Sequence, residues 1–202
     1  NEWNYVKGWV DDFVYSLEVE SGRFNQKCAA FIASAMADCQ SVPLDMLMFY
    51  DARLSTSMNS LFDKTTKWPL KGYYPFYAWS KLVDCGTQVA CTVREGRGKK
   101  CEDATGIVFK DGKLTSPKGT FHTTAAKGAD GSGALLIARY SNDDNTSDTA
   151  TVTVKLDGAS LKKARCHLTD AVRVYTEVPL MPNADGTACI LMQPNSFALV
   201  EW

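Results

Sequence analysis

The stretch Ala150-Thr151-Val152-Thr153-Val154-Lys155-Leu156 alternates apolar and polar side chains. A period of two is typical of a β-strand that has one face in the core and one in solvent. Outward from this stretch, further strand-like runs occupy residues 119–126, 134–141, 164–169, 188–192 and 196–202. Turn pairs such as Asp130-Gly131 and Asp185-Gly186 separate them. This spacing predicts an antiparallel β-sandwich over residues 87–202.

Residues 1–86 follow a different pattern. Residues 23–40 carry apolar side chains at offsets of three and four, which predicts a helix, and an aromatic-rich helix is predicted over 70–84 with Gly86 closing it. Between them, the apolar run 45–50 suits a strand buried on both faces of a parallel sheet. The order helix, strand, helix predicts the last β/α units of an incomplete (β/α)8 barrel. We therefore expect an α+β chain with a barrel portion at 1–86 and a β-sandwich domain at 87–202.

Composition excludes several classes of function. The chain has 202 residues, 45% of them hydrophobic, and a formal net charge of −1, so we expect neither a nucleic-acid partner nor a membrane partner. Its seven cysteines form no CxxC pair and favour reduced thiols and a cytoplasmic location, with a Cys91–Cys101 disulfide as the alternative. The chain has two histidines, far apart in sequence, so we expect no zinc site. The first residue is not methionine, so an export signal upstream would be invisible.

Candidate site residues cluster beside the predicted strand ends. Glu2 has such a position if residues 1–4 end a barrel strand, and Asp51 and Arg53 follow the run 45–50. Flat aromatic faces nearby belong to Trp3, Tyr5, Trp9 and Tyr50. By residue type alone, Glu2 would be a solvated carboxylate and Asp51–Arg53 a structural ion pair. Both interpretations stay open on composition.

Four motifs resemble family 39 glycoside hydrolases of clan A. Asn1-Glu2-Trp3-Asn4-Tyr5 resembles their (T/N)-E-(W/F)-N segment, and Met48-Phe49-Tyr50-Asp51-Ala52-Arg53 resembles the YYDAR segment that ends barrel strand eight. Residues 59–63 are similar to the N-G-L-F-D turn and residues 69–74 to the P-L-K-G-Y-Y start of the last helix. Residues 166–200 resemble the accessory β-sandwich that follows the barrel. The motifs occur in the family's order over most of the chain, although Ser60 replaces a usual glycine and 54–58 diverges.

The resemblance implies a retaining, β-xylosidase-like hydrolase that acts on a carbohydrate substrate. Glu2 would be the nucleophile. The side chains implied in substrate binding are Trp3, Asn4, Tyr5, Trp9, Tyr50, Asp51 and Arg53. No metal or cofactor is expected, because two carboxyl groups suffice for this chemistry.

One catalytic group has no counterpart in the sequence. The family's general acid follows an asparagine after strand four, but the only Asn-Glu pair here is Asn1-Glu2, which matches the nucleophile segment. We therefore expect a C-terminal fragment, inactive when isolated, whose acid lies on a missing N-terminal barrel portion. Two barrel strands leave open edges, so the chain should associate with that portion, self-associate, or bury the strand against its own sandwich.

The alternative is a non-catalytic β-sandwich that binds carbohydrate or supports a barrel. A strip of exposed coplanar aromatics on the sandwich would favour carbohydrate binding. Most aromatic side chains between residues 87 and 202 instead lie at positions that the strand alternation predicts to face the core. Within this alternative, the pattern of aromatic residues therefore favours a supporting role over carbohydrate binding.

Overall fold

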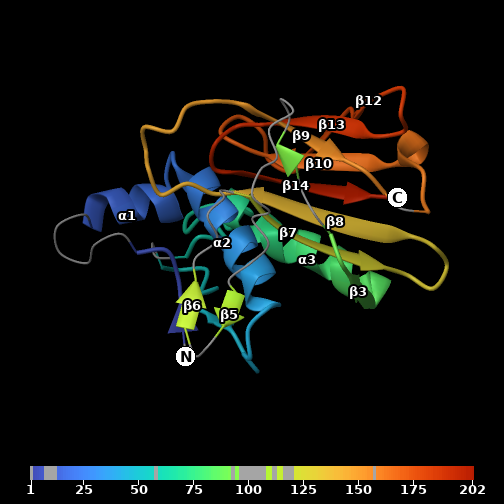
Figure 1. Ribbon diagram of the computed structural model, residues 1–202. Coiled ribbons are helices and arrows are strands. Elements are labelled where there is room, and N and C mark those ends of the chain that lie inside the picture. The colour runs from blue at the N-terminus through green and yellow to red at the C-terminus, as the bar shows by residue number, and fades with distance from the viewer. Residues whose placement is uncertain are drawn as a thin grey trace.

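The chain forms three layers of secondary structure. The computed structural model describes residues 2–6, 13–56, 59–91, 94–95, 108–110, 113–115, 121–156 and 158–202. A four-stranded sheet faces a six-stranded sheet, and helices α2 (Asn25–Cys39) and α3 (Tyr74–Cys85) cover the other face of the six-stranded sheet (Figure 1). The fold is thus mixed α and β with mostly antiparallel sheets, which agrees with the predicted class at this level. The incomplete barrel stays a prediction.

The two large sheets are antiparallel throughout. In spatial order, the six-stranded sheet contains β11 (Thr176–Val178), β10 (Arg165–Thr169), β14 (Ser196–Glu201), β8 (Gly133–Arg139), β7 (Phe121–Lys127) and β3 (Thr87–Val89). The four-stranded sheet contains β12 (Met181–Pro182), β13 (Ala188–Met192), β9 (Ala150–Val154) and β4 (Arg94–Glu95). A separate hairpin joins β5 (Val108–Lys110) to β6 (Lys113–Thr115), and a 3-10 turn η2 (Leu161–Lys163) precedes β10.

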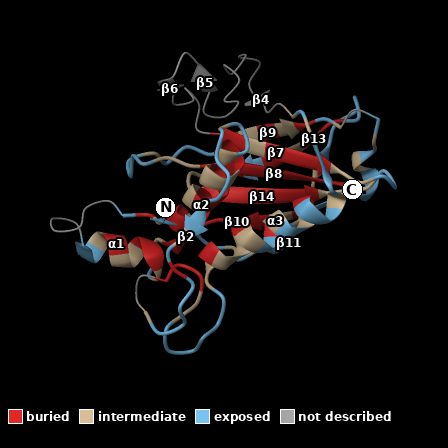
Figure 2. Cartoon of the chain, turned by 90° about the horizontal axis from the view of Figure 1, so that it is seen from below, coloured by how far each residue is buried: buried red, intermediate tan, exposed pale blue. Residues whose placement is uncertain are grey.

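The core between the two sheets follows the period of two. On β9, Ala150, Val152 and Val154 are buried while Thr151 and Thr153 are partly exposed. The facing sheet contributes Leu135, Ile137 and Val200, among others. Figure 2 shows these central strands as a continuous buried layer. The predicted strands 119–126, 134–141, 164–169, 188–192 and 196–202 are all confirmed within a few residues.

A second core lies between the six-stranded sheet and the helices. Ala29 and Ala33 of α2 and Ala78 of α3 pack against Leu136 and Phe197 of the sheet. Alanines at these positions let the helix backbones approach the sheet closely, and β8 is therefore buried on both faces. The helices predicted over 23–40 and 70–84 are confirmed, the second with a 3-10 turn, η1 (Lys71–Tyr73), at its start.

The helical part gives way to strands at Gly86. This residue has φ +86°, a left-handed conformation that glycine adopts without strain, and β3 begins at the next residue. Because α2 and α3 share a core with the six-stranded sheet, the helices and the sheets pack as one body. The division into domains at 1–86 and 87–202 stays a prediction.

A short parallel pair lies at the N-terminal end of the described chain. β1 (Glu2–Trp3) pairs with β2 (Met48–Phe49) in register Glu2 with Met48 and Trp3 with Phe49. The prediction that 45–50 is a strand buried on both faces is wrong. Only two residues are extended, and the exposed side chains include Met46 at 65% and Met48 at 53%. The reason is that, among the described residues, β2 pairs with β1 alone and packs against helices through the Phe49 side.

Gly72 allows a close approach between η1 and the loop before it. An added Cβ would lie 2.3 Å from the carbonyl oxygen of Ser60, which is backbone and cannot swing away. We expect Gly72→Ala to lower the free energy of unfolding by about 2 kcal/mol, measured by urea denaturation. Gly128→Ala is the matched control, since a Cβ there meets mainly the tips of Asp130 and Ser132. Equal losses for the two variants would contradict this account.

The described cysteines are free thiols: Cys28, Cys39, Cys85, Cys91, Cys166 and Cys189. Cys91 shares a hydrogen bond with Thr123 (Sγ to Oγ1, 3.3 Å), so the alternative of a Cys91–Cys101 disulfide is not observed; Cys101 itself lies outside the described residues. Burial raises the pKa of Cys28 and of Cys166 to about 12, so both act as apolar core residues. Within the described ranges, no helix has the length and apolar character needed to cross a membrane.

Candidate functional site

The β1–β2 pair has one packed face and one open face. Trp3 and Phe49 point toward the helices, where Trp3 contacts Phe31 of α2 with ring centroids 5.7 Å apart and Phe49 contacts Phe76 of α3 at 5.4 Å. Side chains alternate along a strand, so Glu2 and Met48 point the other way, and both are exposed. Local packing of aromatic rings against the helices therefore decides that Glu2 faces solvent.

Three of the expected site residues form one cluster after β2. The Asp51 carboxylate accepts from Arg53 Nε at 2.7 Å and from the Arg53 backbone N–H at 3.1 Å. Arg53 Nη2 also donates to the Tyr50 hydroxyl at 2.8 Å. Asp51 is buried, whereas the Arg53 side chain is 65% exposed and the Tyr50 ring is exposed. Asp51, through its hydrogen bonds and its charge, raises the pKa of Arg53, which stays a cation.

This cluster contains the structural ion pair that residue type alone indicates, and it leaves part of the guanidinium reachable. Arg53 is fixed at its backbone as well, since Asn59 Nδ2 donates to its carbonyl oxygen at 2.7 Å. The fully buried Asn59 also accepts from the backbone of Leu61 at 2.9 Å. The loop after β2 is thus held in a fixed geometry by Asn59.

The remaining expected residues lie apart from this cluster. Asn4 is half-buried, and its Oδ1 accepts from the Tyr5 backbone N–H at 2.7 Å. Tyr5 is only 4% exposed, and its hydroxyl donates to Asn142 Oδ1 at 3.3 Å, in the loop between β8 and β9. Its ring is therefore packed rather than presented to solvent. Trp9 lies outside the described residues.

Glu20 is a buried carboxyl group that the sequence did not single out. It ends α1 (Phe13–Glu20), has no solvent exposure, and neither carboxyl oxygen has a hydrogen-bond partner among the described residues. Desolvation, and secondarily the charge of Asp51, raise the pKa of Glu20 to about 8. The group is thus held largely as the neutral acid near neutral pH.

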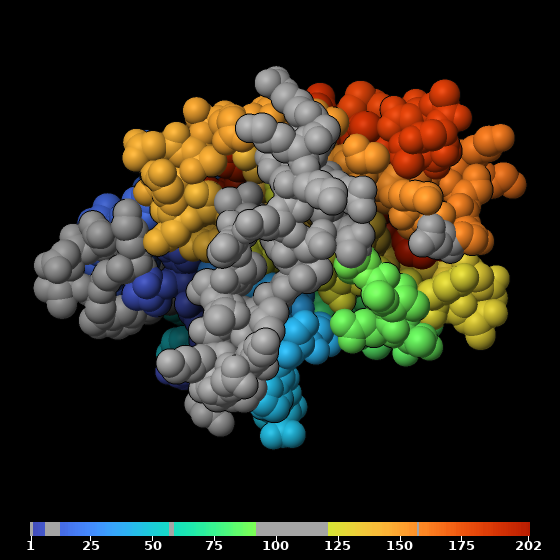
Figure 3. Space-filling view, in the orientation of Figure 1, coloured from blue at the N-terminus to red at the C-terminus, as the bar shows by residue number. Residues whose placement is uncertain are grey.

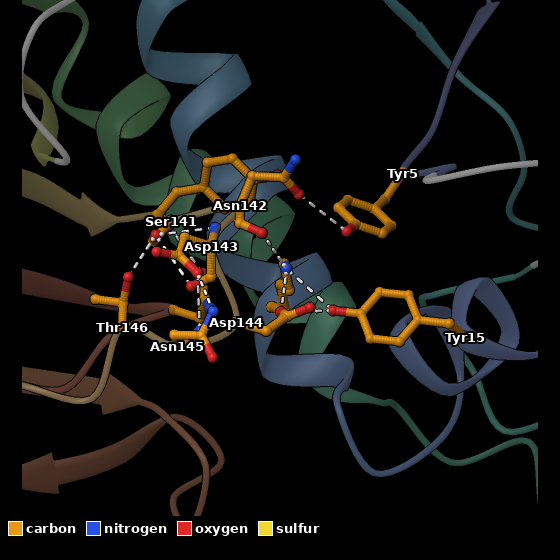
Figure 4. A network of polar contacts seen from close by, with 11 residues as sticks. Tyr5, Tyr15, Ser141, Asn142, Asp143, Asp144, Asn145 and Thr146 are labelled. Atoms are coloured by element: carbon orange, nitrogen blue, oxygen red, sulfur yellow. Dashed lines mark hydrogen bonds and ion pairs between the residues drawn. The ribbon is translucent and has the colours of Figure 1, made fainter. Parts of the chain in front are cut away.

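Lys27 is a buried cation that the sequence also did not single out. Its side chain is 2% exposed, and Nζ lies 2.5 Å from Asp144 Oδ1, 3.1 Å from the Asn142 carbonyl oxygen and 3.0 Å from the Tyr15 hydroxyl. Tyr15 in turn donates to Asp144 at 2.7 Å. Figure 4 shows Tyr5 and Tyr15 reaching from the N-terminal segments to the loop 141–146. Burial and Asp144 raise the pKa of Tyr15, so this phenol remains a neutral donor.

Helix phase offered the one available signal for Lys27. It lies at helical spacing from Phe31, Ser34 and Asp38, a stripe of α2 that is largely buried. A lysine on such a stripe needs a buried acceptor. Its main partner, Asp144, lies far away in sequence in a polar loop, so no local pattern pairs the two.

The described residues contain no group of three or more His, Cys, Asp or Glu side chains that could hold a metal ion. Both histidines have structural contacts. His122 Nδ1 lies 2.9 Å from the Asp38 carboxylate, which joins β7 to α2, and His167 stacks on Tyr175 with centroids 4.6 Å apart. The candidate site therefore consists of carboxylates, aromatic rings and one guanidinium.

Comparison with known proteins gives structural similarity only. No family model matches the sequence, and none of the curated proteins compared with it matches. Among solved structures, one similar chain is the glycoside hydrolase family 30 subfamily 8 xylanase Xyn30A from Clostridium acetobutylicum, with a TM-score of 0.57 and 10% identity. A GH30 endoxylanase from Clostridium papyrosolvens C71 gives 0.54 and 9%, and CelM2, a bifunctional glucanase-xylanase from a metagenome library, gives 0.53 and 14%.

These similarities cover most or all of this chain but a minority of each neighbour. The matched share is 100%, 87% and 100% of this chain, against 41%, 38% and 30% of the three neighbours, in the same order. The chain therefore has a clan A glycoside hydrolase-like fold, and the expected resemblance is confirmed at that level. Kinship with family 39 in particular stays a prediction.

Proposed function

We propose that this chain is the C-terminal part of a retaining glycoside hydrolase that cleaves xylan-type O-glycosidic bonds, with Glu2 as the nucleophile. One observation carries the proposal. The parallel β1–β2 pair leaves Glu2 on its open face, in a chain whose fold resembles xylanase structures over its whole length. The motifs at 1–5 and 48–53 support the narrower proposal of a family 39-type, β-xylosidase-like enzyme.

The proposed chemistry needs two carboxyl groups. Glu2 would attack the anomeric carbon and form a covalent glycosyl-enzyme, which water then hydrolyses. A second carboxyl, about 5–5.5 Å from the first, protonates the leaving oxygen and later activates the water. Glu20 does not suit that role despite its raised pKa, because it has no solvent exposure and cannot reach a substrate. We assign the acid to a barrel portion that this sequence does not include.

The expected substrate-binding residues divide by exposure. The Tyr50 ring and the Arg53 guanidinium are exposed, and we propose that they contact the sugar directly. Buried Asp51 orients Arg53, while Trp3 and Tyr5 fix β1 against the helices and the sandwich. Asn4 and Trp9 complete the proposed set.

The open face also indicates a partner. Four of the five residues 44–48 are apolar and at least 37% exposed (Leu44, Met46, Leu47 and Met48), and exposed apolar patches of this kind mark interaction sites. We propose that the missing barrel portion, or a second copy of this chain, covers them. The isolated chain would then bind substrate weakly and turn over little of it.

A trapping reagent tests the nucleophile without needing the acid. In 2,4-dinitrophenyl 2-deoxy-2-fluoro-β-xyloside the leaving group departs without protonation, and the fluorine slows hydrolysis of the covalent intermediate. Incubation with the chain should add one fluoroxylosyl group to the peptide that contains Glu2, detected by mass spectrometry. An alkyl β-xyloside, which needs a general acid, should show no hydrolysis.

The control is Glu2→Gln, which keeps the size of the side chain and removes the nucleophile. It should carry no label. A label on another carboxylate, or none on Glu2 at saturating reagent, would overturn the assignment of Glu2. Hydrolysis of the alkyl xyloside that Glu2→Gln abolishes would instead show that this chain holds its own acid.

A further inference from the structure

A half-open cavity lies between the N-terminal helices and the sandwich. Its volume is about 480 Å3, within the range of about 300–1,000 Å3 that small-molecule sites occupy. Tyr15 of α1 and Gln26 of α2 line one side, and Thr149 and Gln193 line the other. Figure 3 shows the 141–149 segment lying against the N-terminal segment of the molecule. The cavity is therefore at the junction of two parts of the fold that lie far apart in sequence.

The lining combines flat apolar rings with neutral polar groups. Tyr15 and Phe24 have ring centroids 6.0 Å apart and planes 34° apart, and together they form an aromatic wall. Three amides, Gln26, Gln193 and Asn195, and hydroxyls such as Ser147 and Thr149 surround it. The buried Oε1 of Gln26 has no hydrogen-bond partner among the described residues. Amides donate and accept at once, which suits the vicinal hydroxyl groups of a pyranose.

Charge argues against an anionic ligand. Lys27 is the cation of the lining, and an ammonium group has three donors. Its contacts with Asp144, Asn142 and Tyr15 engage all three. Asp144 is itself 45% exposed at the cavity and would repel a carboxylate or phosphate. The electrostatics therefore favour a neutral, hydroxyl-rich ligand.

We infer that this cavity is a second carbohydrate site, in addition to the face that carries Glu2, and that it holds a neutral oligosaccharide of β-linked pyranoses. The choice of a xylan-type chain rests on the proposed function. The cavity's own lining requires only neutral sugar rings. Tyr5 follows β1 and links this site to it. The Tyr5 hydroxyl contacts the side chain of Asn142, whose carbonyl oxygen accepts from Lys27. A chain bound here would be anchored to both the helices and the sandwich.

The test is a titration of the isotope-labelled protein, carrying Glu2→Gln, with xylohexaose and separately with cellohexaose. Binding should shift the side-chain amide NMR signals of Gln26 and Gln193. Gln193→Ala should weaken binding about 3–10-fold, the loss expected for one hydrogen bond. Ser147→Trp, at an exposed lining residue, should fill the cavity and abolish the shifts. Ser80→Trp on α3 is the matched control, because it adds the same ring to an exposed position away from the cavity.

Each outcome decides the inference. Binding by xylohexaose alone would define a xylan site, and binding by both sugars a general β-glucan and xylan site. Shifts that bypass Gln26 and Gln193, or binding that Ser147→Trp leaves intact, would overturn it. So would equal binding of polygalacturonate, an acidic chain. Because Glu2→Gln is present throughout, trapping at Glu2 can succeed while this site fails, or the reverse.

Discussion

The Glu20→Gln variant is expected to be more stable than the wild-type protein at about pH 9, by up to about 5 kcal/mol. Burial raises the pKa of Glu20 from 4.5 to about 8 in the folded chain. Between these two values the unfolded chain has lost the proton that the folded chain keeps, so the free energy of unfolding falls as pH rises. Each unit of the pKa difference contributes about 1.4 kcal/mol. A glutamine does not titrate, so its unfolding free energy lacks this slope.

The measurement is urea denaturation of both proteins from about pH 4 to 9. Below about pH 4.5, Glu20 is protonated in both the folded and the unfolded wild type. Its ionisation should then add little to the difference in unfolding free energy between the two proteins. Glu18→Gln is the control on the same helix. Glu18 forms a solvent-exposed ion pair with Arg23, so this variant removes a carboxylate of the same helix that is not enclosed. If the unfolding free energies of the wild type and Glu20→Gln changed with pH in parallel, folding would not raise the pKa of Glu20.

Local periodicity predicted most of the secondary structure. The alternation at 150–156 and the helical spacing in 23–40 come from neighbours in sequence, and both elements occur as expected. The prediction of a strand buried on both faces at 45–50 is wrong because burial does not come from neighbours in sequence. Burial of a strand depends on what pairs with it and covers it, and the run itself contains no information on either. The short strands β3, β11 and β12 carry too few residues for a pattern.

The candidate site divides in the same way. Asp51 and Arg53 are close in sequence, so their ion pair could be expected from residue type. Glu20 carries no local sign of its burial in the sequence, and Asp51, whose charge adds to desolvation in raising the pKa of Glu20, belongs to the loop after β2. Resemblance indicated a role for Glu2, and the alternation of β1 explains its exposure. The cavity beside Tyr15 depends on the approach of a loop more than a hundred residues away.

The Asp144→Ala variant is expected to lose about 3 kcal/mol of unfolding free energy, because it leaves the buried ammonium of Lys27 without its carboxylate. The loss stays below the largest values for buried pairs, since Asp144 is half-exposed and Asn142 and Tyr15 still accept from Lys27. The exposed pair Glu18–Arg23 is the comparison, where Glu18→Ala should cost under about 1 kcal/mol.

A double variant separates an unpaired charge from lost packing. Methionine matches the length of lysine and needs no acceptor, so Lys27→Met with Asp144→Ala should be more stable than Asp144→Ala alone by about 2 kcal/mol. Urea denaturation of the four proteins gives the coupling energy between the two side chains. If the double variant were as unstable as the sum of the single changes, the two side chains would act independently. The loss in Asp144→Ala would then come from packing rather than from an unpaired ammonium of Lys27.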